Sequence, residues 1–263
     1  MNLSTLLGLA LGAGIIFFSI TESGLPLSFF LEKGEHGIII VVGGTLTVTL
    51  MGFSFRRIFS MFKIFFAHIL GARRPNYRAT IELILELNKK SSVSGPTSLA
   101  ESIPSIKNKF LKEAVELIAS GVMNERELRE TLELRLKASE EELQSEAEMF
   151  ATIGRFPPAF GLLAATLGMI SLLTKLGEPG AEKLIGPAMA IGLVGTFYGI
   201  AIANFIFLPL AEALKSRAEE EMALRKIIVE GMLLIKKQAN PMVAREALNS
   251  FVSGRDRTKR KAA

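Results

Sequence analysis

The sequence of 263 residues contains no cysteine and only two histidines, His36 and His68. Without cysteine the chain can form neither a disulfide nor a thiolate metal site, and two isolated imidazoles are too few for a metal cluster. The sequence also lacks a glycine-rich phosphate loop, a nucleophile elbow and a pair of acidic residues in an apolar setting. We therefore expect neither an enzyme nor a protein with a bound metal or organic cofactor.

Charged residues are missing from four long segments of a chain that is 49% hydrophobic. The segments are Met1–Thr21, Gly37–Phe55, Phe156–Thr174 and Leu184–Ala211. As helices, they are long enough to cross the roughly 30 Å hydrocarbon core of a bilayer. The apolar runs are continuous and do not alternate with period two, which favours helices over membrane-spanning strands. The sequence thus predicts an all-α membrane protein with four transmembrane helices.

The basic residues are distributed unevenly around these segments. Between Arg56 and Lys137 lie 15 Lys and Arg and after Ala211 lie 12, whereas the two short connections hold only Lys33 and the pair Lys175 and Lys183. The positive-inside rule places the middle region and both termini in the cytoplasm. We attribute the net charge of +5 to membrane orientation and not to nucleic-acid binding, because no aromatic-basic recognition motif accompanies it.

The expected organisation has four parts. Residues 1–55 hold the first two transmembrane helices, and residues 56–150 form a cytoplasmic helical insertion that begins with a helix along the membrane interface. Residues 151–214 hold the third and fourth transmembrane helices, which extend into the cytoplasm, and residues 215–263 form a cytoplasmic helix and a basic tail.

Helix-terminating signals divide the cytoplasmic insertion. Ser91–Pro96 has the composition of a loop, and Gly121 is placed to end a helix. Asn124 and Glu127, three residues apart, have the spacing of a capping box. The helices expected from hydrophobic periodicity are Ala79–Asn88, Ile106–Ala119 and Glu125–Phe150.

An ionisable side chain inside a membrane segment is the usual mark of an ion pathway, because such a group is costly to bury and is kept for function. None of the four segments contains Asp, Glu, Lys or Arg. If the protein helps ions to cross, another chain must supply the group that binds and releases them.

The third and fourth segments carry small residues at close spacing, which allow neighbouring helices to approach each other. Thr196 shares a helical stripe with Gly192 and Gly199. Its hydroxyl can meet hydrated ions or a partner helix, or it can bond its own i−4 carbonyl inside a packing seam. The residues predicted to pack are Gly161, Ala165, Gly168, Gly195, Gly199 and Ala203.

Prolines frame this pair of segments. Pro157 and Pro158 begin the third segment, where a first-turn proline is tolerated because its missing N–H would be unpaired anyway. Pro209 falls inside a run that stays helical beyond it, so we expect it to loosen or kink the helix.

Two stretches, PPAFGLLAATLGMI (Pro157–Ile170) and GPAMAIGLVGTFYGIAIANFIFLPLAEAL (Gly186–Leu214), resemble the third and fourth transmembrane motifs of the MotA/PomA family, the flagellar motor stator subunits. Similar family-like stretches are IIIVVGGTL (Ile38–Leu46), FLKEAVELIASGVMNERELRETLE (Phe110–Glu133) and ANPMVAREAL (Ala239–Leu248). The resemblance covers nearly the whole chain.

This resemblance implies a subunit of a bacterial inner-membrane complex that turns ion flow into torque and so serves motility and chemotaxis. Several copies, expected to be five, surround two copies of a single-span partner of the MotB type. That partner supplies the ion-binding Asp, and the rotor protein FliG receives the force.

The family's functional residues carry over at several positions. Pro158 and Pro209 match prolines that couple ion passage to torque, and Thr196 matches a threonine that lines the channel. Sodium-type members have a second Thr where this chain has Ala165. Since an alanine removes one hydroxyl oxygen that would replace water around Na⁺, the resemblance favours H⁺ as the coupling ion.

Family members contact the rotor through an Arg three residues before a loop glycine and a Glu five residues after it. Aligned on Gly95, these positions are Ser92 and Ala100, so the charges have moved. Each nearby charge can serve as a substitute or be an ordinary solvated helix charge. The candidates are Lys89, Lys90 and Glu101.

Two alternatives stay open. An energiser of the ExbB/TolQ type transmits force to the cell envelope and resembles the last two segments, but it typically has three spans and an external N-terminus. A membrane scaffold would only oligomerise through its glycine faces and would conduct no ions.

Overall fold

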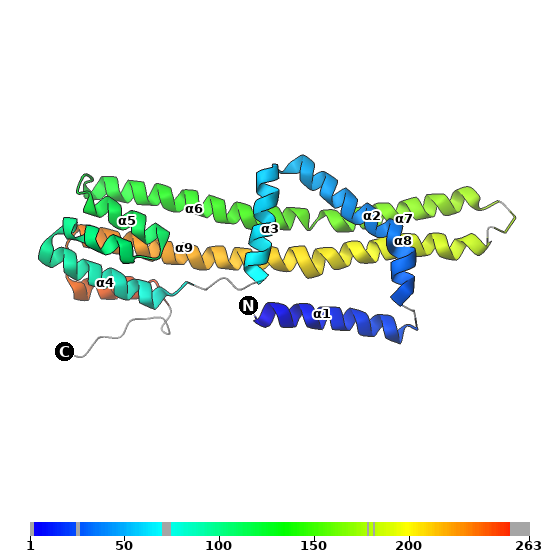
Figure 1. Ribbon diagram of the computed structural model, residues 1–263, viewed down its shortest axis with the longest axis horizontal. Coiled ribbons are helices and arrows are strands. Elements are labelled where there is room, and N and C mark those ends of the chain that lie inside the picture. Colours follow the sequence, from blue (N-terminus) through cyan, green and yellow to red (C-terminus); the bar gives the residue numbers. More distant parts are fainter. Residues whose placement is uncertain (1–2, 25–26, 70–74, 178, 181, 253–263) are drawn as a thin grey trace. The chain divides into compact units, whose positions relative to one another are not determined.

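The computed structural model describes residues 3–24, 27–69, 75–177, 179–180 and 182–252, and the regular secondary structure in these ranges is helical (Figure 1). The predicted all-α class is therefore confirmed. The chain divides into two compact units, residues 1–73 with 145–215 and residues 74–144 with 216–263. The predicted basic tail from residue 253 onward lies outside the described residues.

The first unit is built around two neighbouring helices, with a third helix against both of them. In Figure 1, α7 and α8 run side by side and α2 lies across them. The helices that belong wholly to this unit, with a short π-helical segment η2, are α1 (Leu3–Glu22), α2 (Leu27–Gly52), α3 (Phe55–Ile69), α7 (Phe156–Lys175), α8 (Glu182–Ile202) and η2 (Ala203–Phe207).

Three stretches of the described chain are long and apolar enough to cross a membrane. One is Glu35–Gly52 of α2, and the other two lie within Glu125–Lys175 and Ile185–Lys236. Within α1, Ala10–Glu22 forms a shorter apolar helix. The apolar character of the second, third and fourth predicted segments is thus present in the fold.

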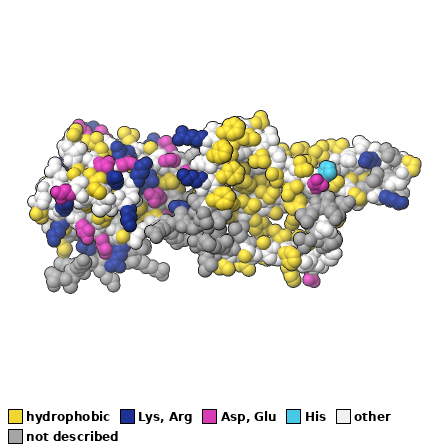
Figure 2. Space-filling model, viewed as in Figure 1, with side chains coloured by type: hydrophobic (Ala, Val, Ile, Leu, Met, Phe, Trp, Pro, Cys, Tyr) yellow, Lys and Arg dark blue, Asp and Glu magenta, His cyan; other side chains and the backbone are white. Residues whose placement is uncertain are grey.

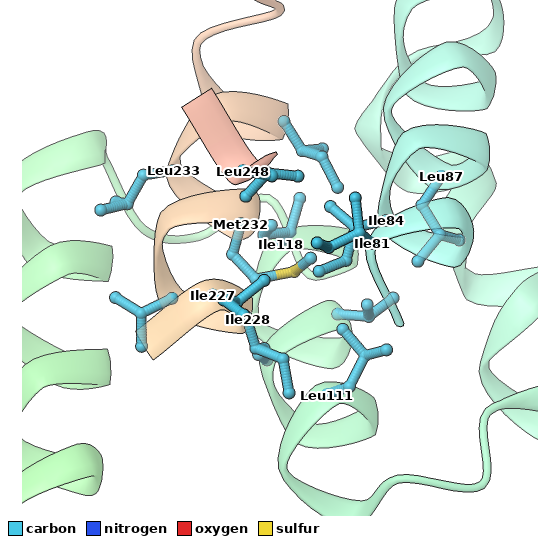
Figure 3. Packing of buried hydrophobic residues seen from close by; sticks show 14 of the residues in the cluster. Ile81, Ile84, Leu87, Leu111, Ile118, Ile227, Ile228, Met232, Leu233 and Leu248 are labelled. Carbon is cyan, nitrogen blue, oxygen red and sulfur yellow. The ribbon is translucent and has the colours of Figure 1, made fainter. Parts of the chain in front are cut away.

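The second unit has its own hydrophobic core, shown in Figure 3. Its elements are α4 (Tyr77–Ser94), the 3₁₀ helix η1 (Pro96–Ser105), α5 (Lys109–Ala119), α10 (Pro241–Asn249), and parts of α6 (Glu125–Ile153) and α9 (Leu208–Lys236). Side chains from distant parts of the sequence, such as Ile84, Leu111, Ile228 and Met232, are at most 1% exposed. Gly231 of α9 lies against the side chain of Ile84, which no short-range pattern could predict.

Helix termini follow the sequence signals in one place and depart from them in another. The predicted capping box is confirmed, since Glu127 N–H donates to Asn124 Oδ1 at 3.0 Å and Asn124 N–H donates to Glu127 Oε2 at 2.8 Å. The predicted loop Ser91–Pro96 is wrong. Ser91 is buried on the inner side of α4, so the helix continues to Ser94 and stops at Gly95, whose φ is 82°.

The helix predicted over Ile106–Ala119 begins three residues late. Its first helical residue is Lys109, and Asn108 caps it by accepting a hydrogen bond from Leu111 N–H at 2.9 Å. The 3₁₀ helix η1, in which Pro104 cannot donate a backbone hydrogen bond, ends at Ser105, and Ile106 after it is extended. The predicted end is correct, because Gly121 adopts a φ of 69° directly after this helix.

Candidate functional site

Glycines bring the backbones of α7 and α8 into direct contact. A Cβ atom on Gly161 would lie 2.9 Å from Thr196 Cα, and one on Gly192 would lie 2.7 Å from Ala165 Cα. Since carbon atoms do not approach so closely, any larger residue would push the helices apart. The structure therefore places Gly161, Ala165 and Thr196 in one seam, and Gly168 continues it against Ala188 O.

The helix α2 reaches the same seam from the other side. A Cβ on Gly37 would lie 2.7 Å from Gly195 Cα, and one on Gly195 would lie 2.8 Å from Ala164 Cβ. Further along α2, Gly44 faces the ring of Phe160. The role of Gly37 was not predicted from the sequence, because nothing local indicates which helix it meets.

The hydroxyl of Thr196 is part of the contact between α7 and α8. It donates to Gly192 O at 3.1 Å within its own helix and to Gly161 O at 3.1 Å on α7. One hydroxyl hydrogen is thus shared between two carbonyls, while the oxygen lone pairs stay available to accept a hydrogen bond or to contact a cation. The i−4 bond is one of the two predicted possibilities, and the bond to α7 adds a second anchor.

Aromatic residues tie the start of α2 to α8. Tyr198 donates its hydroxyl hydrogen to Phe30 O at 2.9 Å. The ring of Phe197 lies 5.4 Å from that of Phe30, centroid to centroid. These contacts and the Gly37 contact hold the first part of α2 against α8.

The start of α7 contacts α8 through the predicted coupling proline. A Cβ on Gly199 would lie 3.2 Å from Pro158 Cα and would overlap Pro157 O. Pro157 is buried and Pro158 is half-buried, in keeping with their place in the first turn of α7. Pro158 and Gly199 are thus direct neighbours.

A π-helical segment interrupts the fourth apolar helix just before Pro209. In η2 the N–H of Leu208 bonds to Ala203 O, five residues back, and Ala203 is 1% exposed. On the neighbouring helix, α6 ends and α7 begins around Gly154. A Cβ on Gly154 would lie 3.0 Å from Phe207 Cβ, so η2 contacts the break between α6 and α7. A π-helical turn inside an α-helix often marks a functional position.

The candidate rotor charges are found in the second unit. Lys90 on α4 pairs with Glu101 on η1, with Nζ and Oε2 2.9 Å apart, and Lys90 also donates to Ser102 Oγ at 3.2 Å. Its ammonium group lowers the pKa of Glu101 by hydrogen bonding and by charge attraction. Lys89 is exposed and has no ion pair among the described residues. Glu101 keeps 79% of its side chain exposed despite the pair.

Two glycines of α2 provide a matched test of this packing. Gly37→Ala should push α2 away from α8 and cost about 1–3 kcal/mol, as overpacking usually does. Gly43→Ala should be neutral or slightly stabilising, because nothing lies within 4 Å of that position. The apparent melting temperature of the detergent-purified protein measures both, and equal values for the two variants would contradict the contact.

Known proteins are similar to this chain over most of its length. A family model described as the MotA/TolQ/ExbB proton channel family matches residues 102–253. The Chemotaxis protein PomA of Vibrio alginolyticus is 30% identical over 254 residues, which are 96% of this chain and 96% of that protein.

Solved structures share the fold. The structure of C. jejuni MotAB matches with a TM-score of 0.84 at 25% identity, covering 97% of both chains. The flagellar MotAB stator complex from Bacillus subtilis matches with a TM-score of 0.85 at 23% identity, covering 97% of this chain and 98% of the other.

Proposed function

The chain belongs to the MotA/TolQ/ExbB proton channel family, and from this membership we propose that it is a stator subunit of the bacterial flagellar motor. With a partner of the MotB type it forms a proton channel and converts ion flow into torque on the rotor. The observation that carries this proposal is the match to PomA, which covers 96% of the chain and so extends well beyond the part matched by the family model. An ExbB/TolQ-type energiser or a passive scaffold would not explain that match.

The membrane arrangement follows from helix character and charge. We propose that α1, α2, α7 and α8 with η2 cross the bacterial inner membrane and that both termini lie in the cytoplasm. The second unit then lies in the cytoplasm, where Lys89, Lys90 and Glu101 face the rotor protein FliG. The basic residues after Gly52 support this orientation.

A partner chain must complete the ion path. Gly37–Gly52 of α2, Phe156–Thr174 of α7 and Leu184–Ile202 of α8 contain no Asp, Glu, Lys or Arg, so these stretches offer no group that can bind and release a proton. We propose that a single-span MotB-type chain supplies the titrating Asp and that five copies of this chain surround two of the partner. Thr196 lines the path, and Ala165 beside it favours H⁺ over Na⁺ because it offers no oxygen ligand.

We propose that η2 and Pro209 together form a flexible joint, which converts a change at the ion site into force. Pro209 has no N–H to donate, and η2 already departs from the regular hydrogen-bonding pattern, so this segment can change shape at low cost. Near this segment, Pro158 in the first turn of α7 packs against Gly199 of α8. A change in the partner's charge can then move the start of α9, which begins at Leu208.

Expression in a motile bacterium that lacks its own stator genes tests the function. This chain and its single-span partner should restore rotation of a tethered bead, and rotation should survive removal of Na⁺ but stop when a protonophore collapses the proton gradient. A motor that stops without Na⁺ would contradict the ion assignment. Correctly inserted protein that never drives rotation would contradict the stator assignment.

Thr196→Val keeps the shape of the side chain and removes the hydroxyl. We expect a small stability loss, about 0.6 kcal/mol for a hydrogen bond between membrane helices, and a strong loss of torque. Thr196→Ser should retain torque because it retains the hydroxyl. If Val and Ser variants rotate beads equally well, the hydroxyl has only a packing role.

Pro209→Ala restores a backbone N–H and should allow η2 to become regular α-helix. The variant should insert and assemble normally and be at least as stable, because a proline inside a helix is unfavourable. Its torque at high load should fall strongly. Pro187→Ala is the matched control, since Pro187 lies inside α8 and outside the joint, and it should keep normal torque. Normal torque in Pro209→Ala would end the joint hypothesis.

A further inference from the structure

The helix α3 lies in a distinctive place within the first unit. It begins at Phe55, three residues after the apolar stretch Glu35–Gly52 of α2 ends. In Figure 1, α3 runs across the direction of α7 and α8. If α7 and α8 cross a bilayer, α3 therefore lies along its surface, at the level where α2 leaves the hydrocarbon.

One face of α3 packs inside the unit. Met61 is 9% exposed, and Ile64 and Phe65 are partly buried against the cluster that contains Phe150 and Leu210. This contact fixes the rotation of the helix about its own axis. It also determines which side chains point away from the protein.

The opposite side of α3 carries an uncovered aromatic face. Four phenylalanines at positions i, i+4, i+7 and i+11 share one side of the helix. We call this set the phenylalanine stripe, and Figure 2 shows a continuous hydrophobic column in its region. Its members, with their exposed fractions, are Phe55 (72%), Phe59 (73%), Phe62 (47%) and Phe66 (57%).

Basic side chains lie beside the stripe. Arg56 and Lys63, seven residues apart, are about 90° around the helix from it, on the side away from the packed face. Both are exposed, and α3 contains no Asp or Glu. Neither has an ion pair among the residues that the structure describes. We call these two residues the basic edge.

We propose that α3 is a binding site for anionic phospholipids. The phenylalanine stripe enters the upper acyl region, and the basic edge binds headgroup phosphates, to which an Arg guanidinium can donate two parallel hydrogen bonds. This inference rests on the proposed membrane placement of the first unit. Lipid is the occupant that fits, because the stripe adjoins the end of a membrane-crossing helix and only basic charges accompany it.

The expected effect is a local enrichment of anionic lipid around α3. Each basic residue should raise the occupancy of α3 by anionic lipid about fivefold at low salt. Because the basic edge is exposed, the enrichment should decrease as ionic strength rises. The phenylalanine stripe has no charge, so its contact with acyl chains should not depend on salt.

The absence of tryptophan from the chain makes a direct test possible. Phe59→Trp places a single fluorophore on the stripe, and Phe65→Trp places one on the packed face as a control. The full chain is reconstituted in phosphatidylcholine vesicles that contain a minority of phosphatidylglycerol, with brominated acyl chains on one lipid or on the other. Bromine quenches tryptophan on contact, so the quenching reports which lipid lies beside it.

We expect the fluorescence of the Phe59→Trp variant to be quenched more than that of the Phe65→Trp variant. Brominated phosphatidylglycerol should quench the Phe59→Trp variant several-fold more than its mole fraction predicts. Adding Arg56→Gln and Lys63→Gln should abolish this excess and leave quenching by phosphatidylcholine unchanged. Lys107→Gln with Lys112→Gln, which removes the same charge from exposed positions elsewhere, should not affect the excess.

Two results would overturn the proposal. Quenching in proportion to mole fraction would show that α3 selects no headgroup, although it lies in lipid. No quenching of the Phe59→Trp variant by either lipid would show that another protein surface, such as a second copy, covers the stripe. Neither result depends on torque, so the stator function can stand if this site fails.

Discussion

The backbone contact between α7 and α8 is the constraint on which the rest of the first unit depends. Lipid tails are as apolar as leucine side chains, so helices in a bilayer associate through close packing and hydrogen bonds, not through the hydrophobic effect. Gly161 and Gly192 allow this approach, and the Thr196 hydroxyl bonds across it. The contact between α2 and α8 depends in the same way on Gly37 and Gly195.

The close contact of α7 with α8 also explains why the proposed partner, and not this chain, would supply the ion-binding group. Glycine and alanine leave no room for an ionisable side chain between α7 and α8, and such a group facing lipid would be costly. In the proposed function, this chain therefore supplies the Thr196 hydroxyl and the joint at η2, and the partner supplies the titrating acid. The second unit has a separate hydrophobic core, which positions α4 and η1 and so the charges of Lys90 and Glu101 on them.

Sequence reasoning predicted the features that local chemistry determines. The capping box at Asn124 and the start of α7 at its prolines depend on neighbours only a few residues away. The contact of Gly37 with Gly195 and the pair Lys90–Glu101 depend on which helices become neighbours, so periodicity could not reveal them. The predicted Ser91–Pro96 loop was wrong because burial of Ser91 against the core outweighs a loop-like composition.

Proton flux into vesicles is the most direct measurement of whether the titrating group lies outside this chain. Vesicles that contain this chain alone should acidify no faster than empty ones, and vesicles that also contain an active form of the single-span partner should conduct protons. Replacing the partner's intramembrane Asp with Asn should return the flux to background. Specific proton conduction by this chain alone would contradict the two-component mechanism.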